Sequence, residues 1–280
     1  MINVMGKFSK TLRALLEISR NPSLLNLVLS DNRYWSNYVH QKFGPNPDRP
    51  LIQLNDIIPE LTDDLEVITS FDGGCLPTDL SLLKALCRKF PESRYFEIGT
   101  WRGESVANVS NIAAECLTLD LTEEEMIRKK FPDSHRNRIG ALPEGIAHLT
   151  HLKGDSMKID FAVLNQQFDV IFIDGDHRYH YVKNDTKNVF RHLVHDRSIV
   201  VWHDYFYSPG LLRFEVLAGI LDGVPEQYKQ YLYCVSSSKC AIFIREPILS
   251  REPHPSAMYE ETFRVTLKYN KAPIPHTVKQ

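Results

Sequence analysis

The sequence predicts an α/β fold: a doubly wound, mostly parallel sheet of seven strands preceded by a helical N-terminal extension. From residue 76 onwards, short continuous apolar segments alternate with amphipathic helical segments, which is typical of a parallel sheet covered by helices on both faces. A glycine turn, Gly99 to Gly103, joins the first of these strands to the next helix. The last two apolar segments follow each other directly, which favours an antiparallel pair at the sheet edge.

The expected elements follow from the spacing of the apolar residues. Parallel strands are expected at 94–99, 116–121, 149–154, 168–174 and 198–204, and closing strands at 230–238 and 239–246. Helices are expected at 77–90, 104–115, 122–131, 181–194 and 211–224. Thr78 is a candidate N-cap for the first of these helices, because its hydroxyl can accept a hydrogen bond from a backbone amide. Together these elements form a predicted main domain, residues 76–246.

Residues 1–75 form the predicted helical extension. Phe8, Leu12, Leu15 and Leu16 recur at helical spacing, and a second short helix is expected after Asn21-Pro22. The apolar faces must pack on something, and three alternatives stand open: the chain's own main domain, a homodimer through the N-terminal helices, or a lid over the substrate. The proline-rich, polar residues 247–280 are expected to form a tail packed on the surface.

The composition gives no reason to expect nucleic acid or an anionic membrane as a partner. The 33 basic and 35 acidic residues give a net charge of −2, so the chain has no strong overall field, although a local basic patch is compatible with these totals. No apolar run approaches the roughly 20 residues of a membrane span, and the N-terminus lacks the apolar core of a signal peptide. A cytoplasmic location without a membrane partner is therefore expected. Five cysteines without a C-x-x-C pair indicate neither a disulfide framework nor a zinc site.

Every predicted parallel strand ends in an acid. In an open α/β sheet, ligands bind outside the carboxyl ends of the strands, so a ligand site is expected at this edge. The acids and their neighbours are Glu97, Asp120, Asp155, Asp174 with Asp176 and His177, and Asp204 with His203.

The spacing of the glycines discriminates between cofactors. A dinucleotide-binding turn has the pattern G-x-G-x-x-G around a pyrophosphate, whereas this turn reads E-x-G-x-x-x-G-x-S. A carboxylate such as Glu97 would repel a pyrophosphate and attract an α-amino group. Gly99 and Gly103 allow close backbone approach, Asp120 is placed to hold two ribose hydroxyls, and Asp155 suits the exocyclic amine of an adenine. The pattern favours S-adenosylmethionine over NAD.

Five segments together carry a resemblance to a known family: FEIGTWRGES, LTLDL, LKGDS, FDVIFIDGDHRYHYVKND and IVVWHDY. They resemble the class I S-adenosylmethionine-dependent methyltransferases, most of all the small-molecule O-methyltransferase-like group with an IDGDHxY block (methyltransferase family 24-like). The resemblance covers residues 76–246 and implies a Rossmann-like methyltransferase fold. It implies the cofactor roles given above, in a site completed by Thr100, Ser105, Leu121, Ser156 and Asp174. The segment 122–148, long and charged, and VHDRS before the fifth strand depart from the family pattern.

The resemblance also implies that Asp174 and Asp204 face the methyl acceptor, and that acids at these positions bind magnesium in metal-assisted relatives. Two ways to remove the acceptor's proton stand open. Asp174 and Asp204 hold either Mg²⁺ or the acceptor hydroxyl directly, and His177 is the candidate general base, with a purely structural role as its alternative. His203 is either a third metal ligand or a packed neighbour of Trp202.

Two further groups of side chains near the acceptor end have open roles. Asp176 is a candidate cap for the helix that begins near Tyr179. Tyr205, Phe206 and Tyr207 form either an aromatic wall for the acceptor or ordinary packing. The predicted function is S-adenosylmethionine-dependent methyl transfer to a small-molecule acceptor, at a hydroxyl oxygen. The alternatives are a catalytically silent cofactor-binding or assembly protein and, disfavoured by the glycine spacing, an NAD-dependent oxidoreductase.

Overall fold

The computed structural model describes residues 4–68, 74–141, 145–208, 210–253 and 262–266. The chain divides into two compact units, Met1–Pro47 and Asp48–Gln280. The second unit thus begins earlier than the predicted main domain, because the short strand β1 (Leu51–Ile52) pairs with a strand near the end of the chain. The predicted borders at 75 and 247 stay predictions, and part of the predicted tail lies outside the described residues.

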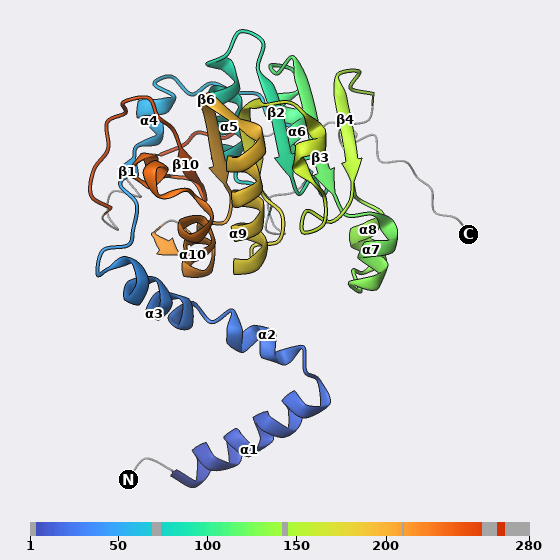
Figure 1. Ribbon diagram of the computed structural model, residues 1–280, viewed down its shortest axis with the longest axis vertical. Helices are drawn as coiled ribbons and strands as arrows, with labels where there is room; N and C mark the ends of the chain where they lie inside the picture. The colour runs from blue at the N-terminus through green and yellow to red at the C-terminus, as the bar shows by residue number, and fades with distance from the viewer. Residues whose placement is uncertain (1–3, 69–73, 142–144, 209, 254–261, 267–280) are drawn as a thin grey trace. The chain divides into compact units, whose positions relative to one another are not determined.

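The second unit contains an eight-stranded sheet in the order β1-β9-β10-β6-β5-β2-β3-β4 (Figure 1). All seven expected strands are present, and β1 is an eighth that is too short to show a sequence pattern. The strands after β1 are β2 (Arg94–Ile98), β3 (Glu115–Asp120), β4 (Leu149–Lys153), β5 (Phe168–Ile173), β6 (Val194–Trp202), β9 (Leu232–Val235) and β10 (Ala241–Phe243).

Strands β2 to β6 pair in parallel, and β10 runs antiparallel to both β6 and β9. The closing strands pair with each other as expected, although β1 covers the outer side of β9. A separate hairpin of β7 (Phe206–Ser208) and β8 (Leu211–Leu212) follows β6. The carboxyl ends of five parallel strands therefore lie side by side, as a doubly wound sheet requires.

Helices cover both faces of the sheet. On one face, Leu83 and Val106 belong to a buried cluster with Phe172, and on the other the ring of Phe190 stacks on Trp202. The α-helices of this unit are α4 (Leu54–Ile57), α5 (Pro77–Arg88), α6 (Glu104–Val109), α7 (Glu123–Arg128), α8 (Asp133–Arg136), α9 (Tyr179–Asn188) and α10 (Phe214–Gly223). The described residues also form the 3₁₀ turns η1 (Phe161–Leu164) and η3 (Glu226–Tyr231) and the π turn η2 (Val189–Leu193).

Several helix ends differ from the sequence expectation: α6 ends at Val109, and α10 begins at Phe214 because Leu211–Leu212 form β8. The two predicted helix caps differ as well. Helix α5 has Leu76, not Thr78, as its N-cap residue, because Pro77 occupies the first helical position and so places Thr78 inside the helix. The carboxylate of Asp79 accepts the hydrogen bond from the backbone N–H of Leu76 at 2.7 Å. Helix α9 has Arg178 as its N-cap residue, so Asp176 precedes the cap and accepts from the backbone N–H of Arg178 at 3.0 Å.

The first unit consists of α1 (Val4–Arg20), α2 (Leu24–Leu29) and α3 (Asn32–Phe43). Asp31 caps α3 by accepting from the backbone N–H of Arg33 at 2.9 Å. The described ranges contain no helix that combines the length and the apolarity needed to cross a membrane. All five cysteines are free thiols, and four of them are buried, as expected for small apolar core residues.

Candidate active site

The residues predicted to bind ligands gather at the carboxyl edge of the sheet. The strand order places the ends of β2, β3 and β4 on one side and those of β5 and β6 on the other. Glu97, Asp120 and Asp155 therefore lie in one half of the edge, and Asp174 and Asp204 in the other. The first half corresponds to the predicted cofactor side and the second to the predicted acceptor side.

The glycine turn after β2 is tightly packed. Gly99 has φ 95°, and a Cβ built on it would lie 2.2 Å from the backbone oxygen of Asp174. Gly103, with φ 80°, is the N-cap residue of α6. Such positions favour glycine, because other residues adopt positive φ at a cost. Between them, Thr100 is buried and its hydroxyl has no hydrogen-bond partner among the described residues. Gly99 therefore allows the end of β2 to approach the Asp174 backbone closely, and the buried Thr100 hydroxyl can hydrogen-bond to a ligand at this turn.

Asp120 holds the backbone of the glycine turn in place. One carboxylate oxygen accepts from the backbone N–H of Trp101 and the other from that of Leu121, both at 2.8 Å. Trp101 has φ 43°, a left-handed conformation rare for a bulky residue. The predicted ribose-binding carboxylate thus also fixes the backbone that would lie beside the ribose. Each oxygen keeps a second lone pair for a ligand hydroxyl.

Glu97 is fully buried beneath the glycine turn, where it accepts a hydrogen bond from the hydroxyl of Tyr95 at 2.6 Å. Burial raises the pKa of Glu97 to about 8, although the hydroxyls of Ser105 and Tyr95 lower it. A cationic amino group placed beside this carboxyl would favour its ionised form. The position therefore suits the α-amino group that the sequence predicted here.

We expect the free energy of unfolding to fall as the pH rises from about 5 to about 8. In this window Glu97 is ionised in the unfolded chain, where its ordinary pKa is 4.5, and is protonated in the folded protein. Glu97→Gln should remove this contribution, which is at most about 5 kcal/mol, and so make the pH dependence less steep. Urea denaturation at a series of pH values measures the free energy of unfolding of both proteins.

Asp185 acts in the same direction, because burial raises its pKa to about 7, so Glu97→Gln should reduce the slope without abolishing it. The matched control is Glu92→Gln, which changes an exposed glutamate near the start of β2 and should leave the pH dependence unchanged. An equal slope in the wild type and in Glu97→Gln would contradict the assignment.

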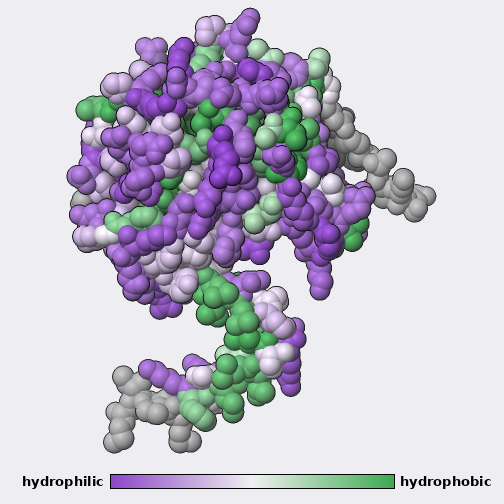
Figure 2. All heavy atoms as spheres, viewed as in Figure 1, coloured by the Kyte–Doolittle hydropathy of each residue, from purple (hydrophilic) through white to green (hydrophobic). Residues whose placement is uncertain are grey.

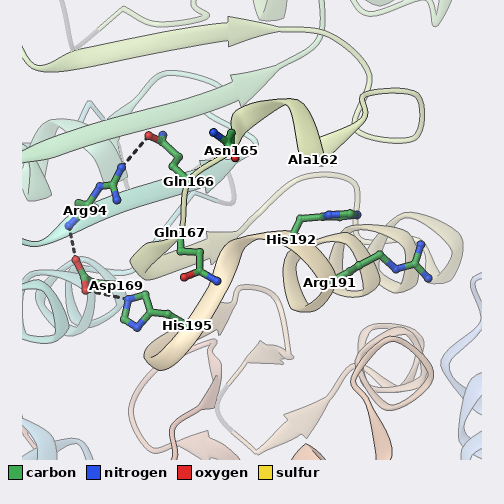
Figure 3. A pocket seen from close by; sticks show the side chains of 9 residues that line it. All are labelled: Arg94, Ala162, Asn165, Gln166, Gln167, Asp169, Arg191, His192 and His195. Carbon is green, nitrogen blue, oxygen red and sulfur yellow. Dashed lines mark hydrogen bonds and ion pairs between the residues drawn. The ribbon is translucent and has the colours of Figure 1, made fainter.

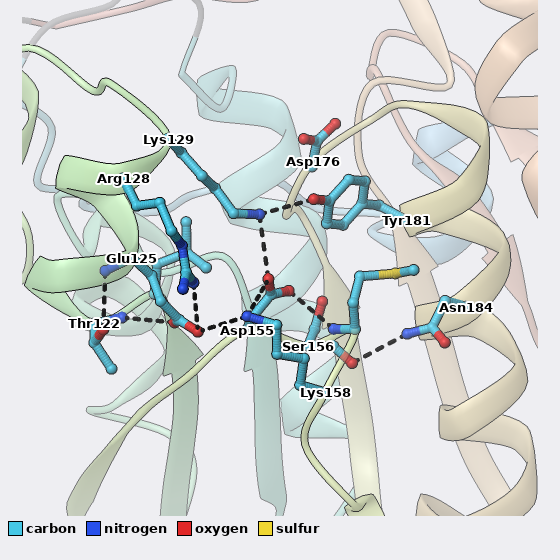
Figure 4. Close-up of polar contacts among 12 residues, drawn as sticks. Thr122, Glu125, Arg128, Lys129, Asp155, Ser156, Lys158, Asp176, Tyr181 and Asn184 are labelled. Carbon is cyan, nitrogen blue, oxygen red and sulfur yellow. Dashed lines mark hydrogen bonds and ion pairs between the residues drawn. The ribbon is translucent and has the colours of Figure 1, made fainter.

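At the far end of the cofactor half, Asp155 lies in a network that the sequence did not reveal (Figure 4). Lys129 Nζ lies 3.3 Å from Asp155 Oδ2 and donates a hydrogen bond to the hydroxyl of Tyr181 at 2.7 Å. Burial raises the pKa of Asp155, but the Met157 amide, Lys129 and Lys158 together lower it by more, so that the pKa lies below its ordinary value. The carboxylate predicted to bind an adenine amine is thus held ionised by lysines from outside the glycine turn. Next to it, Ser156 is buried and its carbonyl accepts from Asn184 at 3.0 Å.

In the acceptor half, His177 and Asp204 lie next to each other. His177 Nδ1 is 3.1 Å from Asp204 Oδ2, and the side chain of His177 is 42% exposed. No hydrogen-bond partner of Nε2 is found in the described part of the chain. Asp204 has φ 54°, a strained conformation of the kind that clusters at functional sites. Asp204 thus holds Nδ1 of the imidazole, and the side chain as a whole stays partly exposed.

Two permanent cations flank Asp204. Arg213 Nη1 lies 3.4 Å from Asp204 Oδ2, and Lys239 Nζ lies 3.9 Å from Asp204 Oδ1. Neither residue stood out in the sequence, since Arg213 is the N-cap residue of α10 and Lys239 precedes β10. Their approach to Asp204 is a product of the fold.

His203 is fully enclosed between carboxylates. Its Nε2 lies 3.1 Å from Asp79 and its Nδ1 lies 3.0 Å from Asp174. Burial lowers the pKa of His203, but Asp174 and Asp79 together raise it well above its ordinary value. Both nitrogens are therefore engaged. Asp79, buried on α5, was missed because an acid in the first turn of a helix is ordinarily explained by capping.

Among the residues that the structure describes, two groups of side chains bring potential metal ligands within 4.8 Å of one another: Asp174, His177 and Asp204, and Cys75, Asp174 and His203. The donor chemistry of the second group is a poor fit, because both nitrogens of His203 face carboxylates. The first group offers the oxygen ligands that Mg²⁺ prefers, but Asp204 already lies beside Arg213 and Lys239. Asp79, Asp174 and Asp204 are thus matched by His203, Arg213 and Lys239, and a dication would add uncompensated charge. The residues do not fit a resident Mg²⁺.

The three aromatic residues after Asp204 have different surroundings. Tyr205 and Phe206 are buried, with ring centroids 4.8 Å apart, and the hydroxyl of Tyr205 accepts from the backbone N–H of Arg49 at 3.4 Å. Tyr207 is 42% exposed, and the guanidinium of Arg213 lies 5.1 Å from its ring centroid. Of the three, Tyr207 has the exposure that an acceptor wall requires.

A cavity of about 570 Å³ lies away from these residues (Figure 3). It is lined at the amino ends of the strands by residues that include Arg94 of β2, Asp169 of β5 and His195 of β6. His195 Nε2 lies 3.0 Å from Asp169, which also accepts from the backbone N–H of Arg94 at 2.8 Å. The carboxyl edge holds the glycine turn and the acids, so we place the chemistry there and not in this cavity.

Residues 96–205 match the model of a family described as a methyltransferase domain. No curated protein is significantly similar in sequence. SAH-bound PaMTH1, a methyltransferase of Podospora anserina, is 16% identical with a TM-score of 0.46, over 81% of this chain and 97% of its own. YcgJ of Bacillus subtilis is 21% identical with a TM-score of 0.33, over 47% of this chain and 51% of its own. The chain thus spans about half the length of YcgJ, and at these scores the functional assignment depends on the family match.

Proposed function

We propose, from the premise that the chain is an S-adenosylmethionine-dependent methyltransferase with its methyltransferase domain at residues 96–205, that it methylates a hydroxyl oxygen of a small molecule without a metal. The observation that supports the proposal is the pairing of His177 with Asp204 at the acceptor half of the edge, 3.1 Å apart. A hydroxyl must lose its proton as it attacks, and a positioned imidazole is the commonest acceptor of such a proton.

S-adenosylmethionine, when bound, supplies an electrophilic methyl group. The chain's own residues bind the cofactor and orient it toward the acceptor. Gly99 and Thr100 belong to the turn against which the cofactor lies. Asp120 holds its ribose hydroxyls, and Glu97 faces its α-amino group. Asp155 lies at the adenine end. Binding both reactants in one orientation supplies much of the rate enhancement in such a transfer.

His177 takes the proton of the acceptor hydroxyl at Nε2. Asp204 orients the ring through Nδ1 and stabilises the imidazolium that forms, since a carboxylate beside the second nitrogen favours the charged ring. Arg213 and Lys239, 3.4 and 3.9 Å from its oxygens, hold Asp204 in place. This arrangement removes the proton without the Lewis acid that a metal provides in other enzymes.

The proposal is tested by calorimetry and by turnover. We expect S-adenosylmethionine to bind, and Asp120→Ala to weaken binding by about 1.5–3 kcal/mol, the range for hydrogen bonds to a charged group. S-adenosylhomocysteine release, measured over a panel of phenols and sugars, should be unchanged in excess EDTA. Loss of turnover in EDTA and its recovery with Mg²⁺ would contradict the metal-free part alone. Tight cofactor binding without turnover on any acceptor would support the silent alternative.

A further inference from the structure

Helix α1 carries an exposed apolar stripe. Phe8, Leu12, Leu15 and Leu16 recur at the spacing that places them on one face of a helix. Their exposed fractions are 72, 52, 57 and 51%. Four large apolar side chains more than half exposed on one helix mark an interaction surface, because scattered single residues would need no explanation but a continuous stripe does.

The rest of α1 is basic. Lys7, Lys10, Arg13 and Arg20 lie outside the stripe, and Glu17 is the one acid among residues 4–20. Arg20 lies 3.2 Å from Glu17, which leaves three basic residues of this helix without an acidic counterpart on it. A helix with an apolar stripe and a basic remainder is typical of segments that lie in a membrane interface.

Helix α2 continues the apolar surface. It has the sequence LLNLVL, with Asn26 as its one polar residue. Leu25, Leu27, Val28 and Leu29 are all exposed, by 46 to 73%. Figure 2 shows apolar side chains over these helices of the first unit. Because exposed leucines occur on more than one side of α2, a flat protein surface would leave some of them in water, whereas the acyl region of a membrane would surround them.

We propose that residues 4–29, which we call the basic-apolar segment, bind the surface of an anionic lipid bilayer. The stripe of α1 and the side chains of α2 would enter the boundary between headgroups and acyl chains, and the basic residues would face anionic headgroups. The segment would lie on the membrane and not cross it. The whole-chain charge balance concealed this basic patch, because acids elsewhere cancel its charge, so the proposal revises the expectation of no membrane partner.

A second copy of the chain is the main alternative occupant. Two α1 helices that share their stripes would leave Lys7, Lys10 and Arg13 on the sides of the helices away from the contact, where the pairing gains nothing from them. An anionic surface, in contrast, attracts each basic residue near it. The charges therefore favour the membrane over a homodimer.

The test is co-sedimentation of the full chain with vesicles of phosphatidylcholine, with and without phosphatidylglycerol. We expect binding to the anionic vesicles, weakened by high salt. The triple variant Lys7→Gln, Lys10→Gln, Arg13→Gln should lower the partition coefficient about 100-fold. The double variant Leu12→Glu, Leu16→Glu should abolish binding. Val163→Glu is the matched control, because Val163 is 71% exposed but lies in the second unit, and it should bind like the wild type.

Each variant should keep the wild-type melting temperature, because the changed side chains are exposed. No binding to anionic vesicles would overturn the proposal, as would equal binding to neutral vesicles or an effect of Val163→Glu equal to that of the double variant. Light scattering separates the alternative: a wild-type dimer that Leu12→Glu, Leu16→Glu converts to a monomer, without vesicle binding, would assign the stripe to a second copy.

Discussion

Replacing His177 by asparagine is expected to lower turnover by about 100- to 10,000-fold, the usual contribution of a general base. The side chain is 42% exposed, so the fold should be unaffected, and binding of S-adenosylmethionine should stay within about twofold because the residue lies in the acceptor half. Single-turnover measurement of S-adenosylhomocysteine release, together with calorimetry, separates the two effects.

The matched control is His180→Asn. His180 is exposed on the first turn of α9, three residues after His177, and its replacement should leave turnover unchanged. Asp204→Asn should lower turnover in the same direction, and the double variant His177→Asn, Asp204→Asn should be little worse than His177→Asn, since the two residues act as a unit. Additive losses, or a wild-type rate for His177→Asn, would show that another group takes the proton.

Gly99→Ala is expected to destabilise the fold by about 3 kcal/mol or more and to abolish cofactor binding. A Cβ at Gly99 would lie 2.2 Å from the backbone oxygen of Asp174, and the φ of 95° adds strain for any other residue. The contact is with backbone, which cannot move aside as a flexible side chain would. Urea denaturation and calorimetry with S-adenosylmethionine measure the two effects.

Gly175→Ala is the control for this prediction. Gly175 belongs to the same pair of strand ends, but a Cβ there would lie 3.4 Å from the nearest atom, Cγ2 of Ile98, which is an ordinary contact. We expect a change in the free energy of unfolding of less than about 1 kcal/mol. Equal effects of the two substitutions would show that the close approach of β2 and β5 does not depend on glycine.

Much of the fold was predictable, because its pattern is local. Continuous apolar segments such as those of β5 and β6 identify buried parallel strands. The acids near the carboxyl ends of these strands must then lie at one edge of the sheet. The short strand β1 was not predictable, because its two residues carry no periodicity and it pairs with β9, about 180 residues later. The cap of α5 was misplaced for a related reason: the choice between Leu76 and Thr78 depends on where Pro77 begins the helix.

The site residues differ in the same way: the place of some follows from nearby residues, and that of others depends on contacts far apart in the sequence. The place of Glu97 and Asp120 near the carboxyl ends of β2 and β3 was predictable, because it follows from the local strand pattern, while their cofactor roles stay predictions. The contact of Asp79 with His203 was not predictable, since it joins residues 124 positions apart. Lys129 at Asp155 arises likewise from the long segment between β3 and β4, which follows no general pattern.

The order of apolar segments, glycines and acids along the chain by itself determined an α/β sheet with a glycine turn at its carboxyl edge, because backbone preference and burial act over a few neighbouring residues. The tertiary structure alone decided which charges meet at that edge. Arg213 and Lys239 approach Asp204 from separate elements, and electrostatic interactions depend on distance in space, which the separation of two residues along the chain does not give.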